Sequence, residues 1–388
     1  MRIVRTLFLL VTTFFLVSCG SQTTLPSIDS DAVRAKTEEQ IREAKRKAEK
    51  RWKEETDIWL ANSRKVGEVA ANILTGGEEY CEEREHIGPY IGTLAWSKYD
   101  FDEKWHKVAL AEFGLEGGAQ VYFVSAGSPA EIGGLKFGDL ILSINNQPVA
   151  RGKKAVADFE KKIKETAKIG VPIQFVIQRD ATHQTISITP SKACKSQVFL
   201  TRDESIDAHA DGEKIILHNG LMEYLNTLDE IALIVSHELA HNSMKHSLVR
   251  RINAGALAGV GFLLGTTIDV GVGALLHAPP TQMLGWEWGK IGYDAGLGVN
   301  TVELEREADY VGLYFMALSG HNIDSTPQFW LRIAELDPKK INIRSAHPTS
   351  AERFVGMEAA IKEINEKKQA GLPRRPERPT IFRNDFAM

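Results

Sequence analysis

The pattern of hydrophobic and polar positions divides the chain into stretches that predict different secondary structure. Residues 30–65 are dense in Lys, Arg and Glu with few apolar positions, which predicts a solvated helix. Residues 66–74 are apolar enough to pack on a core, and Gly76-Gly77 predicts the end of that helix. Residues 118–149 alternate short β-branched runs with Gly, Pro and Asn, which predicts strands and turns. A β-rich unit therefore follows a charged helix.

The later part of the chain has helical periodicity at 231–246 and 301–320, and the apolar positions of both stretches predict buried helices. Between them, residues 253–280 are apolar and glycine-rich. Their uninterrupted part is too short to span a membrane, and Asp269 interrupts its continuation. We expect a glycine-laced helical hairpin here. Membrane contact and a plain core segment are the alternatives.

Composition narrows the functional classes. The chain has 388 residues, which is enough for two or three domains. Apolar residues make up 43% and charged residues 25%, as in ordinary soluble globular proteins. The formal net charge of −4 gives no basis for a nucleic-acid partner. An enzyme and a protein-binding module remain as the classes to separate.

The first residues predict export. Arginines precede an apolar run at 7–17, as in a secretory signal. The run ends in Leu16-Val17-Ser18-Cys19, which resembles the bacterial lipobox. The resemblance implies removal of residues 1–18 and a membrane anchor through lipid on Cys19. Because no Asp follows Cys19, it also implies the outer membrane of a bacterial envelope, facing the periplasm. A plain signal peptide with a chance cysteine is the alternative.

Two further cysteines, Cys81 and Cys194, remain after the first one is assigned to lipid. An even pair in an oxidising compartment predicts a disulfide. Two buried free thiols are the alternative. A bridge between them would hold together the two ends of the β-rich stretch that lies between.

The β-rich stretch has specific turn signals. Ser128 is expected to cap a short helix that begins at Pro129, and Asn145-Asn146 is expected to form a hairpin turn. A helix at 155–166 and a strand at 173–179 would close the unit.

The run GSPAEIGGLKFGDLILSINNQPV resembles the most characteristic segment of bacterial PDZ domains. The resemblance implies a domain at 88–190 that binds an extended peptide by strand addition. It also implies a loop that captures a chain-end carboxylate, which we place at Ile91, Gly92, Thr93 and Leu94. A β-rich spacer that binds nothing is the alternative.

The stretch IALIVSHELAHNSMKH contains the candidate metal-binding and catalytic residues. His237 and His241 are four residues apart, so on a helix they share a face and can bind one metal ion. Glu238 lies beside them and is placed to take a proton from a water molecule. A chance match is the alternative, although a buried helix would then carry polar groups without compensation.

A catalytic zinc site needs a third protein ligand. The metzincin pattern is excluded because Met244 and Ser247 stand where it requires Gly and His, and His246 is expected on the surface. Glu305 and Asp309 share a face of the helix at 301–320. Glu305 is the candidate third ligand, and Asp309 is expected to accept a hydrogen bond from a ligand histidine.

HELAH followed by ELEREAD resembles the M48 metallopeptidases, and so does His347-Pro348 with the later Arg353. The resemblance implies one Zn2+ per chain on His237, His241 and Glu305, with Glu238 as general base. It gives His347 the role of oxyanion donor or fourth ligand, and Arg353 a structural or transition-state role. Asp207 stands where many members have Asn. By analogy with mobile plugs in this family, the hairpin at 253–280 is expected to cover the active site. The substrate is expected along the edge of a strand at 214–218.

The fold class expected from these readings is α+β. A mainly helical zincin-type metallopeptidase domain has a small edge sheet and an inserted β-rich PDZ domain. The expected plan is a signal peptide at 1–18, a charged helical spacer at 19–61, the first peptidase helix at 62–87, the PDZ domain at 88–190, the peptidase core at 191–370 and an extended tail at 371–388.

Two functions follow from this plan. The first is a membrane-anchored periplasmic zinc endopeptidase that cuts protein or peptide substrates, in the setting of envelope quality control. The second is a chaperone-like scaffold lipoprotein that uses its PDZ domain and has a silent metal site. The complete zinc set favours the first. The oligomeric state stays open.

Overall fold

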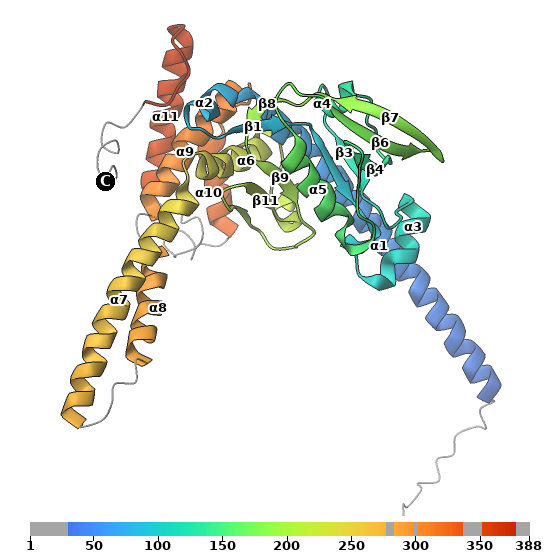
Figure 1. The fold of residues 1–388 in the computed structure, drawn as a ribbon, viewed down its shortest axis with the longest axis horizontal. Helices are drawn as coiled ribbons and strands as arrows, with labels where there is room; N and C mark the ends of the chain where they lie inside the picture. Colours follow the sequence, from blue (N-terminus) through green and yellow to red (C-terminus); the bar gives the residue numbers. More distant parts are fainter. Residues whose placement is uncertain (1–29, 277–282, 298–300, 337–350, 378–388) are drawn as a thin grey trace, which may run out of the picture. The chain divides into compact units, whose positions relative to one another are not determined.

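The computed structural model describes residues 30–276, 283–297, 301–336 and 351–377 (Figure 1). The chain divides into two units, residues 1–51 and 52–388. The long helix α1 (Ser30–Gly76) begins in the first unit and ends in the second. One continuous helix therefore replaces the spacer and separate first helix that we expected. Its buried positions begin at Trp52, ahead of the expected start at residue 62, because large aromatic residues are scattered among the charges.

The helical body of the second unit contains α2 (Glu78–Glu83), α6 (Leu228–Ser243), α9 (Thr301–Leu318), α10 (Thr326–Leu336) and α11 (Ala351–Gln369). In it α6 packs on α9 and α9 packs on α11. A short 3-10 turn, η4 (Asn219–Glu223), precedes α6. The apolar face of α6 is buried in the main hydrophobic core together with α9 and the last part of α1. This packing fixes the two helices that carry the candidate metal ligands.

A three-stranded sheet lies against α6. Its strands are β9 (Gln197–Leu200), β10 (Ala208–Ala210) and β11 (Lys214–Leu217), in the order β10-β11-β9. Strand β11 pairs with β10 on one side and β9 on the other. The expectation that a substrate lies along the 214–218 edge is therefore wrong, because that strand is central. A single strand read from the sequence does not reveal which neighbours it will have.

The PDZ region forms its own sheet in the order β2-β3-β4-β6-β7, with β5 paired to β4. Its elements are β2 (Thr93–Trp96), η1 (Lys98–Asp100), η2 (Glu103–Trp105), α3 (His106–Phe113), β3 (Gln120–Val124), α4 (Pro129–Ile132), β4 (Leu140–Ile144), β5 (Gln147–Pro148), η3 (Gly152–Lys154), α5 (Ala155–Thr166), β6 (Ile173–Arg179) and β7 (Thr182–Ile188). A second hydrophobic core lies within this region.

The turn predictions in the PDZ region are confirmed. The Ser128 side chain accepts a hydrogen bond from the backbone of Glu131, and Pro129 begins α4. Asn145 and Asn146 both have positive φ, +47° and +63°, between the paired strands β4 and β5. Asn tolerates this left-handed conformation better than most residues, which is why the pair predicts a hairpin turn.

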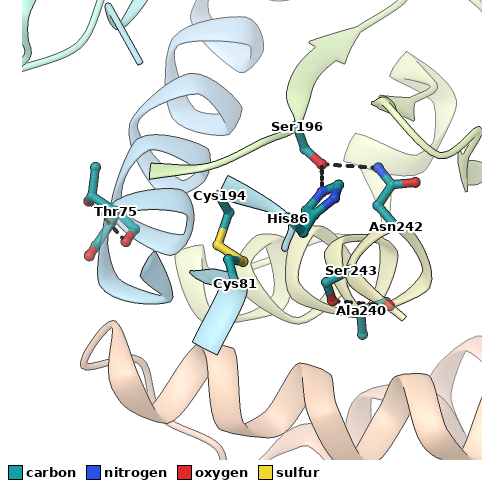
Figure 2. The surroundings of a disulfide bond; sticks show 9 residues. Thr75, Cys81, His86, Cys194, Ser196, Ala240, Asn242 and Ser243 are labelled. Carbon is teal, nitrogen blue, oxygen red and sulfur yellow. Dashed lines mark hydrogen bonds between the residues drawn. A yellow bond between two sulfur atoms is a disulfide. The ribbon is translucent and has the colours of Figure 1, made fainter. Parts of the chain in front are cut away.

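A two-stranded neck joins the PDZ region to the helical body. Strand β1 (Ile87–Tyr90) pairs antiparallel with β8 (Ser191–Cys194), and Ile87 lies opposite Cys194. The structure forms the disulfide between Cys81 and Cys194, whose Cα atoms are 5.3 Å apart (Figure 2). The two ends of the intervening chain are thus held together by hydrogen bonds and by a covalent bond.

The apolar, glycine-rich segment forms part of a helical hairpin. Helix α7 (His246–Leu276) packs antiparallel on α8 (Met283–Leu297), with Gly261 against Trp288 and Gly292 against Leu257. The hairpin extends beyond the predicted 253–280 at both ends, because the described part of that segment, residues 253–276, lies entirely in the first arm. The pair exposes large apolar side chains, so a plain core segment is excluded. They include Val260, Leu263, Leu264, Trp286 and Ile291.

Among the described helices, one is long and apolar enough to cross a membrane by length and composition, at 246–268. Its first residue, His246, is not available to lipid, because it is 1% exposed and bonded to residues of the helical body. The described structure otherwise has the expected α+β class: a mainly helical domain with small sheets and a β-rich PDZ region.

Candidate metal centre

Helix α6 is built to present its polar residues inside the body. The Thr227 side chain accepts a hydrogen bond from the backbone of Glu230 and caps the helix, and a nearly continuous apolar run then buries it. Helix α9 approaches α6 closely at Gly312. A Cβ atom at Gly312 would lie 3.1 Å from the backbone nitrogen of His237. Glycine at this position thus sets the distance between the two helices.

Three side chains from these helices converge. The Nε2 atoms of His237 and His241 are 3.1 Å apart. The Glu305 carboxylate lies 3.1 Å from His237 Nε2 and 3.4 Å from His241 Nε2. All three residues are buried, and Glu305 is 0% exposed. This is the spacing at which one ion can be held by all three groups.

A carboxylate and a guanidinium support His237 from behind. Asp309 Oδ1 lies 3.0 Å from His237 Nδ1. Arg353 donates two hydrogen bonds to the Asp309 carboxylate, at 2.6 and 2.7 Å. With Nδ1 directed at Asp309, His237 presents the lone pair of Nε2 to the site. Arg353 is 2% exposed, so Asp309 keeps its charge inside the core through this pair.

A second relay supports His241, and it corrects one expectation. His246 was expected on the surface but is 1% exposed, with Nδ1 2.9 Å from His241 Nδ1 and Nε2 3.1 Å from Glu307. If Glu307 accepts from His246, then His246 can accept from His241, which leaves His241 Nε2 for the ion. The residue is buried because α7 begins immediately after α6 and turns it back onto the site.

Arg250 is a site residue that sequence reasoning missed. It lies one turn after His246 on α7 and donates a hydrogen bond of 2.9 Å to Glu305 Oε1. Its positive charge thus faces the Glu305 carboxylate beside the two histidines. A basic residue at the start of an otherwise apolar helix was the available signal, but it gives no partner without the fold.

Burial and the neighbouring charges shift the pKa values of the two histidines in opposite directions. Burial lowers the pKa of His237, but hydrogen bonds to Asp309 and Glu305 outweigh it and raise the pKa to about 10. Burial and the neighbouring charge of His237 lower the pKa of His241 to about 4. The pKa of Asp309 is lowered because Arg353 and His237 outweigh the effect of burial. The raised pKa of His237 shows that the carboxylates of Asp309 and Glu305 favour positive charge beside them, which a metal cation would also supply.

Of the other residues predicted from the sequence to act at the site, some lie within the described part of the chain and some lie outside it. Glu238 follows His237 on α6 and is 2% exposed, inside the body with the ligands. His347 and Cys19 lie outside the described residues. The role of Glu238 as proton carrier stays a prediction.

The predicted carboxylate-binding loop lies at the start of the PDZ sheet. Gly92 has φ +78°, and its carbonyl accepts from the Ser125 backbone. Ile91 is 7% exposed and accepts from Ala130. Thr93 and Leu94 begin β2, where Leu94 packs against the main core. The loop conformation needs glycine, but its role in binding peptides stays a prediction.

Comparison with known families divides the chain into a PDZ region and a peptidase region, as the fold does. The model of peptidase family M48 matches residues 173–361, and the PDZ domain model matches residues 103–189. The two matches overlap at 173–189, where β6 and β7 belong to the PDZ sheet. The solved structure of the HtrA3 PDZ domain with a phage-derived ligand aligns with 28% of this chain and 88% of its own, at 20% identity. Its TM-score of 0.22 is too low to support a statement on fold.

Curated relatives match the peptidase part. The beta-barrel assembly-enhancing protease of Yersinia pestis is 26% identical over 141 residues, 35% of this chain and 28% of its own. A Vibrio cholerae protein provisionally given that name is 32% identical over 146 residues, again 35% and 28%.

The mitochondrial metalloendopeptidase OMA1 of Schizosaccharomyces pombe is 23% identical over 188 residues, 47% of this chain and 52% of its own. The chain thus spans about a quarter to a half of the length of these relatives. With its two converging helices and both family matches, the chain contains a domain of peptidase family M48, a family of metal-dependent peptidases, and a PDZ domain.

Proposed function

We propose that the chain is a zinc-dependent endopeptidase that hydrolyses peptide bonds of protein substrates. The observation that carries the proposal is the convergence of His237, His241 and Glu305 at 3.1–3.4 Å. Tetrahedral zinc with bonds of about 2.0–2.1 Å places neighbouring ligand atoms about 3.3 Å apart. Two imidazoles and one carboxylate also form a donor set that zinc favours. The residues present therefore fit one zinc ion per chain.

The ion would supply Lewis-acid chemistry, polarising the scissile carbonyl and making a water molecule more acidic. The chain's own residues do the rest. Glu238 accepts the proton of the attacking water and returns it to the leaving amine. Asp309 and Arg353 hold His237 in one orientation through the attack. His347 is the proposed oxyanion donor, or a further ligand in the resting enzyme.

The substrate is proposed to lie extended along β10. Among the described strands, β10 pairs only with β11, so its other edge is available for strand addition. It packs against α6, which carries the two histidines. A peptide added there would place a backbone carbonyl beside the metal centre without unfolding any pairing already present.

The cellular setting rests on the sequence and on the relatives' names. A lipid on Cys19 would anchor the enzyme at the periplasmic face of a bacterial outer membrane. Relatives named for beta-barrel assembly enhancement support a role in envelope protein quality control. In this role the PDZ domain would bind peptide segments or regulate access. The apolar α7–α8 hairpin is proposed as a cover for the site or as a contact with the membrane.

The test compares Glu238→Gln with wild type and with Glu358→Gln, which changes an exposed glutamate of α11. Casein cleavage and zinc content are measured on the full chain. The proposal expects Glu238→Gln to keep zinc and to lose cleavage by at least about a hundredfold, in the range of general acid–base contributions. The control should match wild type. Equal activity in all three, or none in any, would favour the scaffold function instead.

A further inference from the structure

A second group of metal-ligating side chains lies on the small sheet, away from the catalytic residues. Asp207, His209 and His218 each offer one ligand atom, and these atoms lie within 4.8 Å of one another. All three side chains are partly exposed, so an ion from solution can reach them. Side-chain rotations bring such a group to the separation of about 3.3 Å that tetrahedral zinc requires.

The strand register places the three on one face. Ala208 pairs with Leu217, and both are buried against the core. His209 pairs with Ile216 on the opposite, outer face, and the backbone of His218 donates to the carbonyl of Asp207. Because side chains alternate along a strand, Asp207, His209 and His218 all belong to the outer face. Helix α6 packs on the inner face, so this group is separate from the catalytic centre.

A hydrogen bond orients His218 for binding. Its Nδ1 lies 2.5 Å from the Ser205 hydroxyl, whose backbone N–H donates to Asp203 at 2.8 Å. A ring that donates from Nδ1 keeps its Nε2 lone pair for a metal ion, the arrangement found around bound metals. Asp207 uses one oxygen to accept from the Ala208 backbone, at 2.9 Å, and its second oxygen remains for a ligand bond.

The two imidazoles do not stack. The rings of His209 and His218 meet edge to face, with centroids 5.6 Å apart and an interplanar angle of 81°. This arrangement leaves room for their nitrogen atoms to converge on one point. Two nitrogen donors and one carboxylate oxygen suit zinc, copper or nickel better than magnesium or calcium, which prefer all-oxygen sites.

We propose that Asp207, His209 and His218 form a second, solvent-accessible site for a zinc-class transition-metal ion, with Ser205 as the residue that positions His218. Three protein ligands leave one corner to water, so the ion exchanges with solution more readily than the buried one. The site requires no catalytic activity and does not depend on the proposed function.

The first test counts zinc on the full chain. Wild type and His209→Ala/His218→Ala are dialysed against excess Zn2+, returned to a defined free concentration, and their zinc content is measured. We expect two equivalents in wild type and one in the double variant. His183→Ala, which changes an exposed histidine of β7, is the matched control and should keep two. One equivalent in wild type, or two in the double variant, would overturn the proposal.

The second test isolates the new site. His237→Ala/His241→Ala removes the catalytic ligands and should retain one equivalent, which a further His218→Ala change should remove. Circular dichroism confirms that each variant is folded. Ser205→Ala in this background should weaken zinc binding by about tenfold or more, as loss of an orienting partner does. Zinc that is retained by the triple variant would contradict the proposal. A full chain that binds zinc at this second site but cleaves no substrate would contradict only the proposed function.

Discussion

The Nδ1 atom of His246 lies 2.9 Å from the Nδ1 atom of His241, inside the body of the protein. The other nitrogen of His246 lies 3.1 Å from Glu307. His241 thus receives from His246 the support that His237 receives from Asp309. Each ligand histidine is oriented by a partner from another part of the chain, and metal affinity is expected to depend on both.

Replacing His246 should therefore weaken the metal site without removing a ligand. His246→Ala is expected to lower zinc affinity by about 10- to 100-fold, the range for partners that orient a ligand. Zinc competition with a chelator measures the effect in a background with His209→Ala/His218→Ala. His183→Ala is the control. An unchanged affinity would mean that His246 only fills space.

The close approach of α9 to α6 predicts the effect of one methyl group. Gly312→Ala would place Cβ 3.1 Å from the His237 backbone nitrogen, and overpacking of this kind costs about 1–3 kcal/mol. Gly356→Ala in α11 meets no atom within 4 Å and should be neutral or stabilise by up to about 1 kcal/mol. Urea denaturation compares the two. Equal stabilities would show that the helices have room to separate.

The disulfide at the neck should contribute to stability. Cys81 and Cys194 are separated by 113 positions, and a bridge that closes a long loop typically adds about 2–4 kcal/mol. The double change Cys81→Ser/Cys194→Ser is expected to lower the free energy of unfolding by that amount under oxidising conditions. Adding a reductant should reproduce the loss in wild type and have no effect on the variant. A reductant effect on the variant would contradict this assignment.

His86 gives the protein an acid-sensitive position beside the same neck. Figure 2 shows its ring bonded to Ser196, which also accepts from Asn242 of α6. Burial, with the charges of Lys195 and Lys245, lowers the pKa of His86 to about 4. Protons bind His86 more strongly in the unfolded chain, where the pKa is about 6.5. The stability that neutral His86 contributes is therefore present above pH 6.5 and lost as the pH falls towards 4.

His86→Gln tests this pH dependence. Between pH 7 and pH 5, wild type should lose about 1 kcal/mol more stability than the variant, after allowance for screening by solvent. Denaturation at both pH values measures the difference. His183→Gln, on the exposed strand β7, should behave as wild type does. A wild-type loss no larger than that of His86→Gln would refute the assignment.

Local signals predicted the elements, and tertiary contacts decided the rest. The helix at 155–166 and the strand at 173–179 have the predicted bounds, because helical periodicity and strand alternation are local properties of the sequence. The i, i+4 spacing on α6 and the similar spacing on α9 brought the metal residues to notice for the same reason. The central position of β11, the burial of His246 and the contact of Arg250 with Glu305 all depend on which segments meet in space, and spacing along the chain does not encode this.

The group of Asp207, His209 and His218 likewise depends on which strands pair in space. His209 and His218 lie on separate strands, and each alone is an ordinary surface histidine. Only the antiparallel pairing of β10 with β11 brings them and Asp207 to one face. The spacing of these three residues along the chain matches no metal-binding motif, so the sequence alone does not reveal the group.

The most direct measurement is anomalous X-ray diffraction at the zinc absorption edge from crystals of the zinc-loaded chain. The account predicts a buried peak within about 2.0–2.2 Å of His237 Nε2, His241 Nε2 and a Glu305 carboxylate oxygen. A zinc peak that lies beyond bonding distance of Glu305, or no peak between the two histidines, would contradict it.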